Sequence, residues 1–172
     1  THDLNAEQLC ALARHTDASR LELIVHHHLP IFHTEHCVFA RFLSDGNSWR
    51  DCGRPCEHHD VHLVDRDGTR HRVYADMGCR NTVFNGVAQS GAASVPAFLA
   101  AGYGIFRIEL VDEAPADIPA LVARYTSLLR GDGDATDVWR WLGKTQVQGI
   151  TEGSLAVRTT PFVLKPTARG GA

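Results

Sequence analysis

The stretch Leu21-Glu22-Leu23-Ile24-Val25-His26-His27-His28 indicates which class of fold to expect. Residues 21–25 are strand formers interrupted only by Glu22, a pattern typical of a buried strand in a parallel sheet. Three histidines follow directly, and the active site of α/β proteins lies at the carboxyl ends of parallel strands. We therefore expect His26, the histidine nearest the strand, to be a catalytic residue. For His27 and His28, exposure to solvent is the simpler expectation.

Helical and extended patterns alternate on both sides of this stretch. Asn5 and Gln8 predict the N-cap and capping box of a helix over residues 6–15. Apolar spacing predicts a helix over 94–101, a strand over 105–111, and helices over 118–129 and 134–143. This alternation favours an α/β fold with a parallel sheet covered by helices. A complete (β/α)8 barrel needs about 250 residues, so this chain of 172 could supply only part of one.

Residues from about 26 to 80 are expected to form an insert in this fold. Apolar periodicity is lost over residues 26–60, which predicts a loop-rich segment without an apolar core of its own. Residues 61–64 and 71–74 flank a glycine-containing turn and predict a small β-hairpin. We expect a partial α/β domain over residues 1–143. Residues 144–172 would be a C-terminal extension and tail, with short strands around 154–159 and 162–165.

Composition excludes several classes of protein. With 44% hydrophobic and 22% charged residues, the chain is expected to fold around one core and not to be disordered. It contains no apolar run near the ~18 residues that a membrane span needs, and no signal-peptide pattern, so we expect a cytoplasmic protein without a membrane partner. A net charge of −3 gives no support for general nucleic-acid binding, although a local basic patch is allowed. The start at Thr1, without an initiator methionine, suggests a piece of a longer polypeptide.

Four of the five cysteines and nine of the eleven histidines lie between residues 26 and 79. In a cytosolic chain, clustered thiols indicate metal or redox chemistry rather than disulfide bonds. The candidate ligands are Cys37, Cys52, Cys56 and Cys79. Gly53 and Pro55 shape a tight turn between the second and third of these cysteines, so both of their sulfurs can bind one inorganic centre.

The number of thiols does not identify the metal, because iron–sulfur clusters and structural zinc both take four thiolates. The C-x3-C spacing favours iron, since structural zinc more often uses C-x2-C. Zinc with a histidine ligand, or unligated buried thiols, are the alternatives. Cys10 lies on the apolar side of the first predicted helix and is expected in the core.

Other polar residues have two interpretations each. Arg107 and Glu109 alternate with apolar residues on a predicted strand, where charges are costly to bury unless they are paired or functional. They are candidate catalytic residues, or they form a structural salt bridge with Arg80 or Glu22. Asp76 is expected either to lie near a substrate pocket or to cap a turn. The histidines that flank the cysteines either donate hydrogen bonds to sulfur or are ordinary loop residues: His33, His36, His58 and His59.

The chain resembles the U32 peptidase family, also called collagenase-like peptidases, over roughly residues 3 to 130. Residues 21–26 are similar to the family's LEVFVHG signature. The similarity continues through Glu35-His36-Cys37, Cys52-Gly53-Arg54-Pro55-Cys56, Ala75-Asp76-Met77-Gly78-Cys79 and Phe106-Arg107-Ile108-Glu109.

This resemblance implies the C-terminal part of a TIM-like barrel, with a cysteine-rich insert that holds a 4Fe-4S cluster near the barrel mouth. Cys37, Cys52, Cys56 and Cys79 would be the cluster ligands, and His26, Arg107 and Glu109 would be pocket residues. Several family members take part in oxygen-independent hydroxylation of RNA bases or of a ubiquinone precursor, with prephenate implicated as oxygen donor. The missing strands would come from a longer precursor or a partner chain.

The chain departs from the family pattern at two places. Pro30 replaces a common cysteine and His27 replaces the usual glycine, so Cys79 must supply the fourth thiolate. The KIEGR element is present as residues 107–111 without its Gly-Arg ending, since Leu110 and Val111 stand in those places.

Two other functions compete with a cluster-dependent enzyme. Proteolysis is the literal meaning of the family name, but the sequence contains neither G-x-S-x-G nor H-E-x-x-H and offers no convincing nucleophile arrangement beyond the clustered thiols. A non-catalytic, zinc-stabilised subunit that needs a partner chain is the other alternative, because an incomplete parallel sheet exposes its edges.

Overall fold

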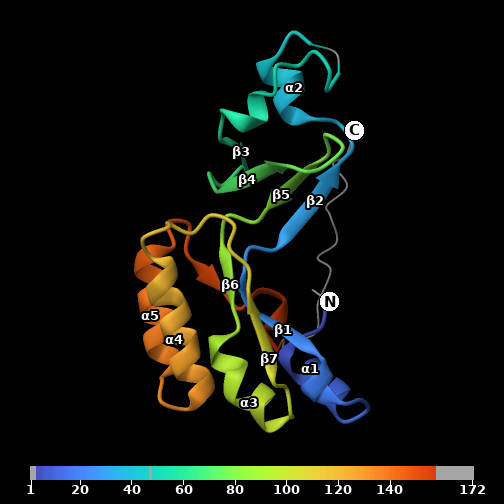
Figure 1. The fold of residues 1–172 in the computed structure, drawn as a ribbon. Coiled ribbons are helices and arrows are strands. Elements are labelled where there is room, and N and C mark those ends of the chain that lie inside the picture. The colour runs from blue at the N-terminus through green and yellow to red at the C-terminus, as the bar shows by residue number, and fades with distance from the viewer. Residues whose placement is uncertain (1–2, 47, 158–172) are drawn as a thin grey trace, which may run out of the picture.

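The computed structural model describes residues 3–46 and 48–157, which form two four-stranded sheets (Figure 1). The first sheet has the strand order β7-β1-β6-β8 and the second has the order β2-β5-β4-β3. The strands are β1 (Glu22–His27), β2 (Pro30–Thr34), β3 (Val61–Val64), β4 (Arg70–Ala75), β5 (Asn81–Phe84), β6 (Ala88–Ser90), β7 (Ile105–Ile108) and β8 (Ile150–Thr151). In Figure 1 the second sheet lies above the first, and β2 begins where β1 ends.

The first sheet is mixed. Strands β1 and β7 are parallel, with Glu22 opposite Ile105, so the carboxyl ends of the two strands lie side by side. Strand β6 is antiparallel to β1 and parallel to β8. The helices packed with this sheet are α1 (Ala6–Ala13), α3 (Val95–Ala100), α4 (Ile118–Arg130) and α5 (Ala135–Thr145). The predicted capping box of Asn5 and Gln8 starts α1, and Gly131 ends α4 with φ 84°.

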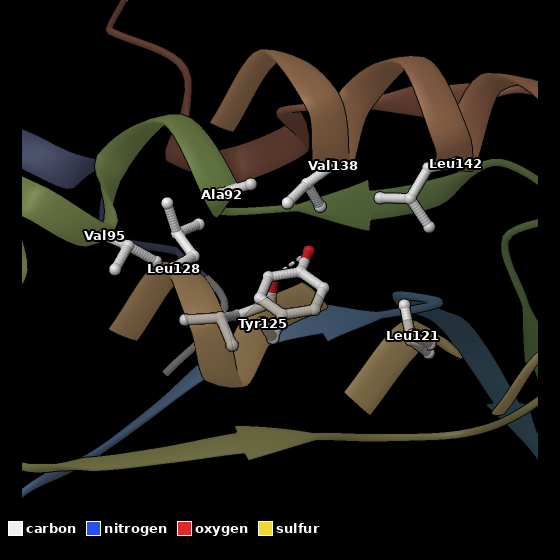
Figure 2. Close-up of a cluster of buried hydrophobic side chains, with 8 residues drawn as sticks. Ala92, Val95, Leu121, Tyr125, Leu128, Val138 and Leu142 are labelled. Carbon is white, nitrogen blue, oxygen red and sulfur yellow. Dashed lines mark hydrogen bonds between the residues drawn. The ribbon is translucent and has the colours of Figure 1, made fainter. Parts of the chain in front are cut away.

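Tyr125 lies at the centre of the main core, between α4, α5 and the strands (Figure 2). Its hydroxyl donates a 3.0 Å hydrogen bond to the Val25 carbonyl and lies 2.8 Å from the Ser90 hydroxyl. The other buried members of this core include Leu121, Leu128, Val138 and Leu142. A second core joins α1 to the sheet through Leu9, Leu23, Phe98 and Tyr103.

The second sheet is antiparallel throughout and has its own small core. The predicted hairpin is confirmed as β3 and β4, with Val61 opposite Val73. Strand β5 pairs with β4 on one side and β2 on the other. Phe39, in helix α2 (Val38–Leu43), packs with Val73 and Val83 and is only 2% exposed. The expectation that residues 26–60 lack an apolar core is therefore wrong, because long-range pairing to β4 and β5 gives this segment a folded partner.

The α/β class is confirmed, but the expected parallel sheet is not, because β6 runs antiparallel between β1 and β8. No closed barrel is formed by the residues that the structure describes. Gly153–Leu155 form a 3-10 turn where a strand was expected, and the rest of the predicted strand pair lies outside the described residues. The division at residue 143 stays a prediction, with α5 continuing to Thr145 and β8 pairing beyond it. None of the described helices is long and apolar enough to cross a membrane.

Candidate functional site

Two of the three consecutive histidines meet a buried glutamate at the carboxyl end of β1. The Nε2 atom of His26 donates a 2.8 Å hydrogen bond to the Glu113 carboxylate, and Nε2 of His28 lies 3.2 Å from the same oxygen. The Glu113 side chain, 2% exposed, also accepts hydrogen bonds from the Val111 and Asp112 amides, at 2.7 and 3.2 Å. We refer to His26, His28 and Glu113 as the histidine–glutamate cluster. The expectation that His28 faces solvent is wrong, because its side chain is 3% exposed.

The surroundings determine the charges of this cluster. Burial alone would raise the pKa of Glu113, but hydrogen bonds from His26, His28 and the Val111 amide outweigh it and hold the pKa well below its usual value. Burial would lower the pKa of His28, yet Glu113 and the Asn85 carbonyl, 2.7 Å from Nδ1, raise it overall. Both ring nitrogens of His28 thus face acceptors, which favours the imidazolium ion.

His26 differs from His28 in its second nitrogen. The Nδ1 atom of His26 is buried and has no hydrogen-bond partner among residues 3–46 and 48–157. Because the Glu113 carboxylate can only accept, Nε2 of His26 is the nitrogen that donates to it. Glu113, with its lowered pKa, and His28, with its raised pKa, form a buried ion pair in this cluster.

His27 belongs to a different group of side chains. Its Nδ1 atom lies 3.7 Å from the Glu109 carboxylate, and its side chain is 2% exposed, so the expectation that it faces solvent is also wrong. The Nε atom of Arg107 lies 3.1 Å from Glu22 and 3.3 Å from Glu109. The salt bridge to Glu22, one of the two expected alternatives, is therefore present, while Arg107 remains 49% exposed.

A small cavity of about 260 Å³ adjoins this ion pair. Glu22, His27, Gln89 and Arg107 form its polar wall, while leucines of α1 and β1 contribute apolar surface. His26 lines neither this cavity nor the larger one described next. The predicted catalytic residues are thus divided between a buried cluster, which holds His26, and the surroundings of a small cavity, where Arg107 and Glu109 lie.

The four candidate ligand cysteines line one larger cavity of about 1670 Å³, which we call the cysteine cavity. They reach it from three separate segments of the second sheet. Cys37 is the N-cap of α2, Cys52 and Cys56 lie between α2 and β3, and Cys79 lies in the turn between β4 and β5. Arg54 and Cys79, which also line the cavity, have left-handed backbones, with φ 52° and 61°.

The donor set fits a metal or cluster in number and kind, because all four thiols are free and surround one space. Burial raises the pKa of Cys56, with a further contribution from the neighbouring Cys37 thiol. No three His, Cys, Asp or Glu side chains of the described residues are close enough together to hold a metal ion. The arrangement therefore places four thiols along the wall of a cavity, without a coordination shell among the described residues. Cys10 lies elsewhere, with its sulfur 3.8 Å from the Ala97 carbonyl.

The interpretation of the sequence missed Glu113, the residue that joins two of the histidines. A signal was available, because Glu113 follows β7 in the chain and the histidines end the neighbouring strand β1. Neighbouring parallel strands have their carboxyl ends at the same edge of a sheet. An acidic residue that follows one strand can therefore contact histidines at the end of the other. Asp76 does line the cysteine cavity and accepts a hydrogen bond from the Thr82 hydroxyl.

In a comparison with protein families, residues 1–153 match the model described as Peptidase family U32. The searches of curated proteins and of solved structures returned no match.

Proposed function

Because the chain belongs to peptidase family U32, we propose that it is an iron–sulfur-dependent enzyme of this family, or a portion of one. The observation that carries the proposal is that cysteines spread over residues 37–79 line the walls of one cavity. Free thiols in this number also fit a reducing compartment such as the cytoplasm.

Cys37, Cys52, Cys56 and Cys79 would hold a 4Fe-4S cluster, which exchanges single electrons when bound. Only thiolates bind metal, so the raised pKa of Cys56 means that this thiol loses its proton as it binds. The segment of Cys52 and Cys56 contains only a short 3-10 turn, Pro55–Glu57, and we expect it to move inward on binding.

The reaction proposed is oxygen-independent hydroxylation of an RNA base or a small aromatic compound. Trp49 supports a flat aromatic substrate, because its ring lines the cysteine cavity and is 63% exposed. Arg41 and Arg54 also line the cavity and could attract phosphate. In this proposal Arg107, on the wall of the small cavity, forms part of the substrate pocket. Glu109 orients Arg107 through their salt bridge, and His26 fixes the end of β1.

We further propose that the parallel pair β1 and β7 is part of a TIM-like barrel, completed by a longer precursor or a partner chain. Strand β7 is an edge strand in the part of the chain that the structure describes, and Ile105 on it is 45% exposed. An open edge of this kind can pair with a further strand.

The test is to purify the chain without oxygen and to quantify iron, sulfide and zinc. The proposal expects a brown protein with about four irons and four sulfides per chain, as a 4Fe-4S cluster requires. Single replacements by serine at the four cavity cysteines should remove most of the iron. Cys10→Ser is the matched control and should retain it, because Cys10 packs against the core of α1.

A zinc-stabilised, non-catalytic subunit is the second candidate, because His36 and His59 also line the cysteine cavity and could replace a thiolate. A colourless anaerobic preparation with stoichiometric zinc would favour it and reject the cluster. If the chain hydrolysed peptides and kept this activity after replacement of all four cysteines by serine, the protein would be a peptidase and the proposed cluster-dependent function would be rejected.

A further inference from the structure

The segment between β7 and α4 contacts both sheets. On the side of the first sheet, the Glu109 amide donates a 2.8 Å hydrogen bond to the His26 carbonyl. On the side of the second sheet, the Tyr74 hydroxyl donates a 2.6 Å hydrogen bond to the Val111 carbonyl. Arg72 of β4 also lies 3.8 Å from the Asp112 carboxylate. Residues 109–113 therefore bridge the strand that ends in the histidines and the strand that lines the cysteine cavity.

The chain crosses between the sheets at two short connections in the same place. Residues 28–29 connect β1 to β2, and residues 85–87 connect β5 to β6. The Asn85 amide donates a 2.8 Å hydrogen bond to the Leu29 carbonyl, and Nδ1 of His28 donates a 2.7 Å bond to the Asn85 carbonyl. The second crossing is also tied to the second sheet, since the Gly86 amide donates a 3.1 Å hydrogen bond to Nδ1 of His71. The relative placement of the sheets therefore depends on the hydrogen bonds and side chains at these crossings.

Glu113 is the residue that joins the crossing to the bridging segment. Its carboxylate contacts His26, the penultimate residue in β1, and His28, the first residue of the crossing. The same carboxylate binds the Val111 and Asp112 amides of its own segment. A buried carboxylate with this many donors has one favourable position, and a neutral side chain in its place would leave His28 without its ionic partner.

We propose that Glu113 is a positioning residue that fixes the second sheet, with its cysteine cavity, relative to the first sheet, with its small cavity. The importance of this placement for catalysis rests on the proposed function, in which both cavities serve one reaction. The geometric claim itself concerns only the junction and can be tested without a bound metal or a substrate.

The proposal includes a dependence on pH through His28. The charged and titratable groups around His28 are Glu113, Asp112 and His26, and Arg72 lies beyond Asp112. Deprotonation of His28 removes the cation that faces Glu113. The junction should therefore loosen as the pH rises through the pKa of His28, while the interiors of the two sheets stay closed.

Hydrogen–deuterium exchange of the full chain tests this, read at single amides. Glu113→Gln should raise exchange of the junction amides of Asn85, Glu109 and Val111 by roughly tenfold or more, the effect of losing one charged hydrogen bond. Amides within the β4–β5 pairing should exchange as before. The matched control is Glu109→Gln, which removes a carboxylate that contacts Arg107 and His27 but keeps Glu113.

His28→Gln separates positioning from simple loss of stability. Its amide can donate to Glu113 at any pH, so junction exchange, corrected for the intrinsic rate, should no longer increase as the pH rises through the native His28 pKa. Equal increases over both sheets in Glu113→Gln, unchanged junction exchange, or a retained pH dependence in His28→Gln would each overturn the proposal. Iron content of the same preparations reports separately on the proposed function, because exchange at the junction is read whether or not iron is bound.

Discussion

The histidine–glutamate cluster and the cysteine cavity differ in how their polar groups are used, although the two histidines of the cluster and the first cysteine lie close in the chain. In the cluster, strand ends and backbone amides surround one buried carboxylate, and hydrogen bonds within the chain hold it. The cysteine cavity is lined by loops and turns together with parts of α2 and β4, and it carries exposed side chains such as Trp49 and Met77. The difference fits the two proposals made above, in which the cluster stabilises the junction and the thiols of the cavity bind a metal or cluster.

The largest expected effect tests the cluster side of this comparison. Glu113→Ala should lower the free energy of unfolding by about 3–5 kcal/mol, because it leaves buried His28 without its ionic partner. Urea denaturation followed by circular dichroism measures this. Glu109→Ala, which breaks a partly exposed pair, should cost at most about 1 kcal/mol. Equal losses in both variants would contradict the distinction.

Metal removal tests the cavity side. A metal ion whose free concentration is 100 times its dissociation constant stabilises the folded, metal-binding chain against unfolding by about 2.7 kcal/mol. Treatment of the anaerobically purified protein with a chelator should therefore raise hydrogen exchange in residues 37–60, by about 100-fold at that concentration. Amides of β1 and β6 should not change. If exchange rose in the first sheet as much as around the cysteines, the two regions would not be independent.

Asn81 tests how firmly the cavity is attached to its sheet. This residue is fully buried, its side-chain oxygen accepts a 2.5 Å hydrogen bond from the Val38 amide, and its amide group donates to the Arg80 carbonyl. Asn81→Ala should cost about 1–3 kcal/mol of unfolding free energy, because it leaves a backbone N–H without a partner at the start of α2. If Asn81→Ala lost iron without a change in the free energy of unfolding, Asn81 would support the cysteine cavity and not the stability of the fold.

The smallest expected effect is a difference in the pH dependence of stability. The folded structure lowers the pKa of Glu113. Its contribution to the free energy of unfolding is therefore complete above 4.5, the pKa of the unfolded chain, and is lost as the pH falls through the folded pKa. His28 has a raised pKa, so its contribution is complete below the unfolded value of 6.5 and is lost as the pH rises through the folded value.

The stability advantage of the native protein over His28→Gln should thus be largest between about pH 4.5 and 6.5, and of order 1 kcal/mol. Denaturant midpoints at several pH values measure it. An advantage that increased above pH 8 would show that the charge of His28 has the opposite role.

Local pattern predicted the elements whose apolar spacing or capping is complete in the chain itself. The helix at Ala135–Thr145 begins after Asp134, and α4 ends at Gly131, close to the predicted limits. Strands β2 and β5 were missed, because β2 contains the exposed His33 and begins at Pro30, and β5 is only four residues long. Such strands form because a neighbour supplies hydrogen bonds, which no local pattern reveals.

The sequence by itself determined the family, the α/β class, the hairpin and the segment in which the cysteines and histidines gather. These features depend on residue type and on spacing along a short stretch. Tertiary structure alone decided that His27 and His28 are buried, that Glu113 meets two of the histidines, and that four cysteines surround one cavity. The physical reason is distance along the chain, because His26 and Glu113 are 87 residues apart. Only the parallel pairing of β1 and β7 places the carboxyl ends of these two strands, and the residues that follow them, side by side.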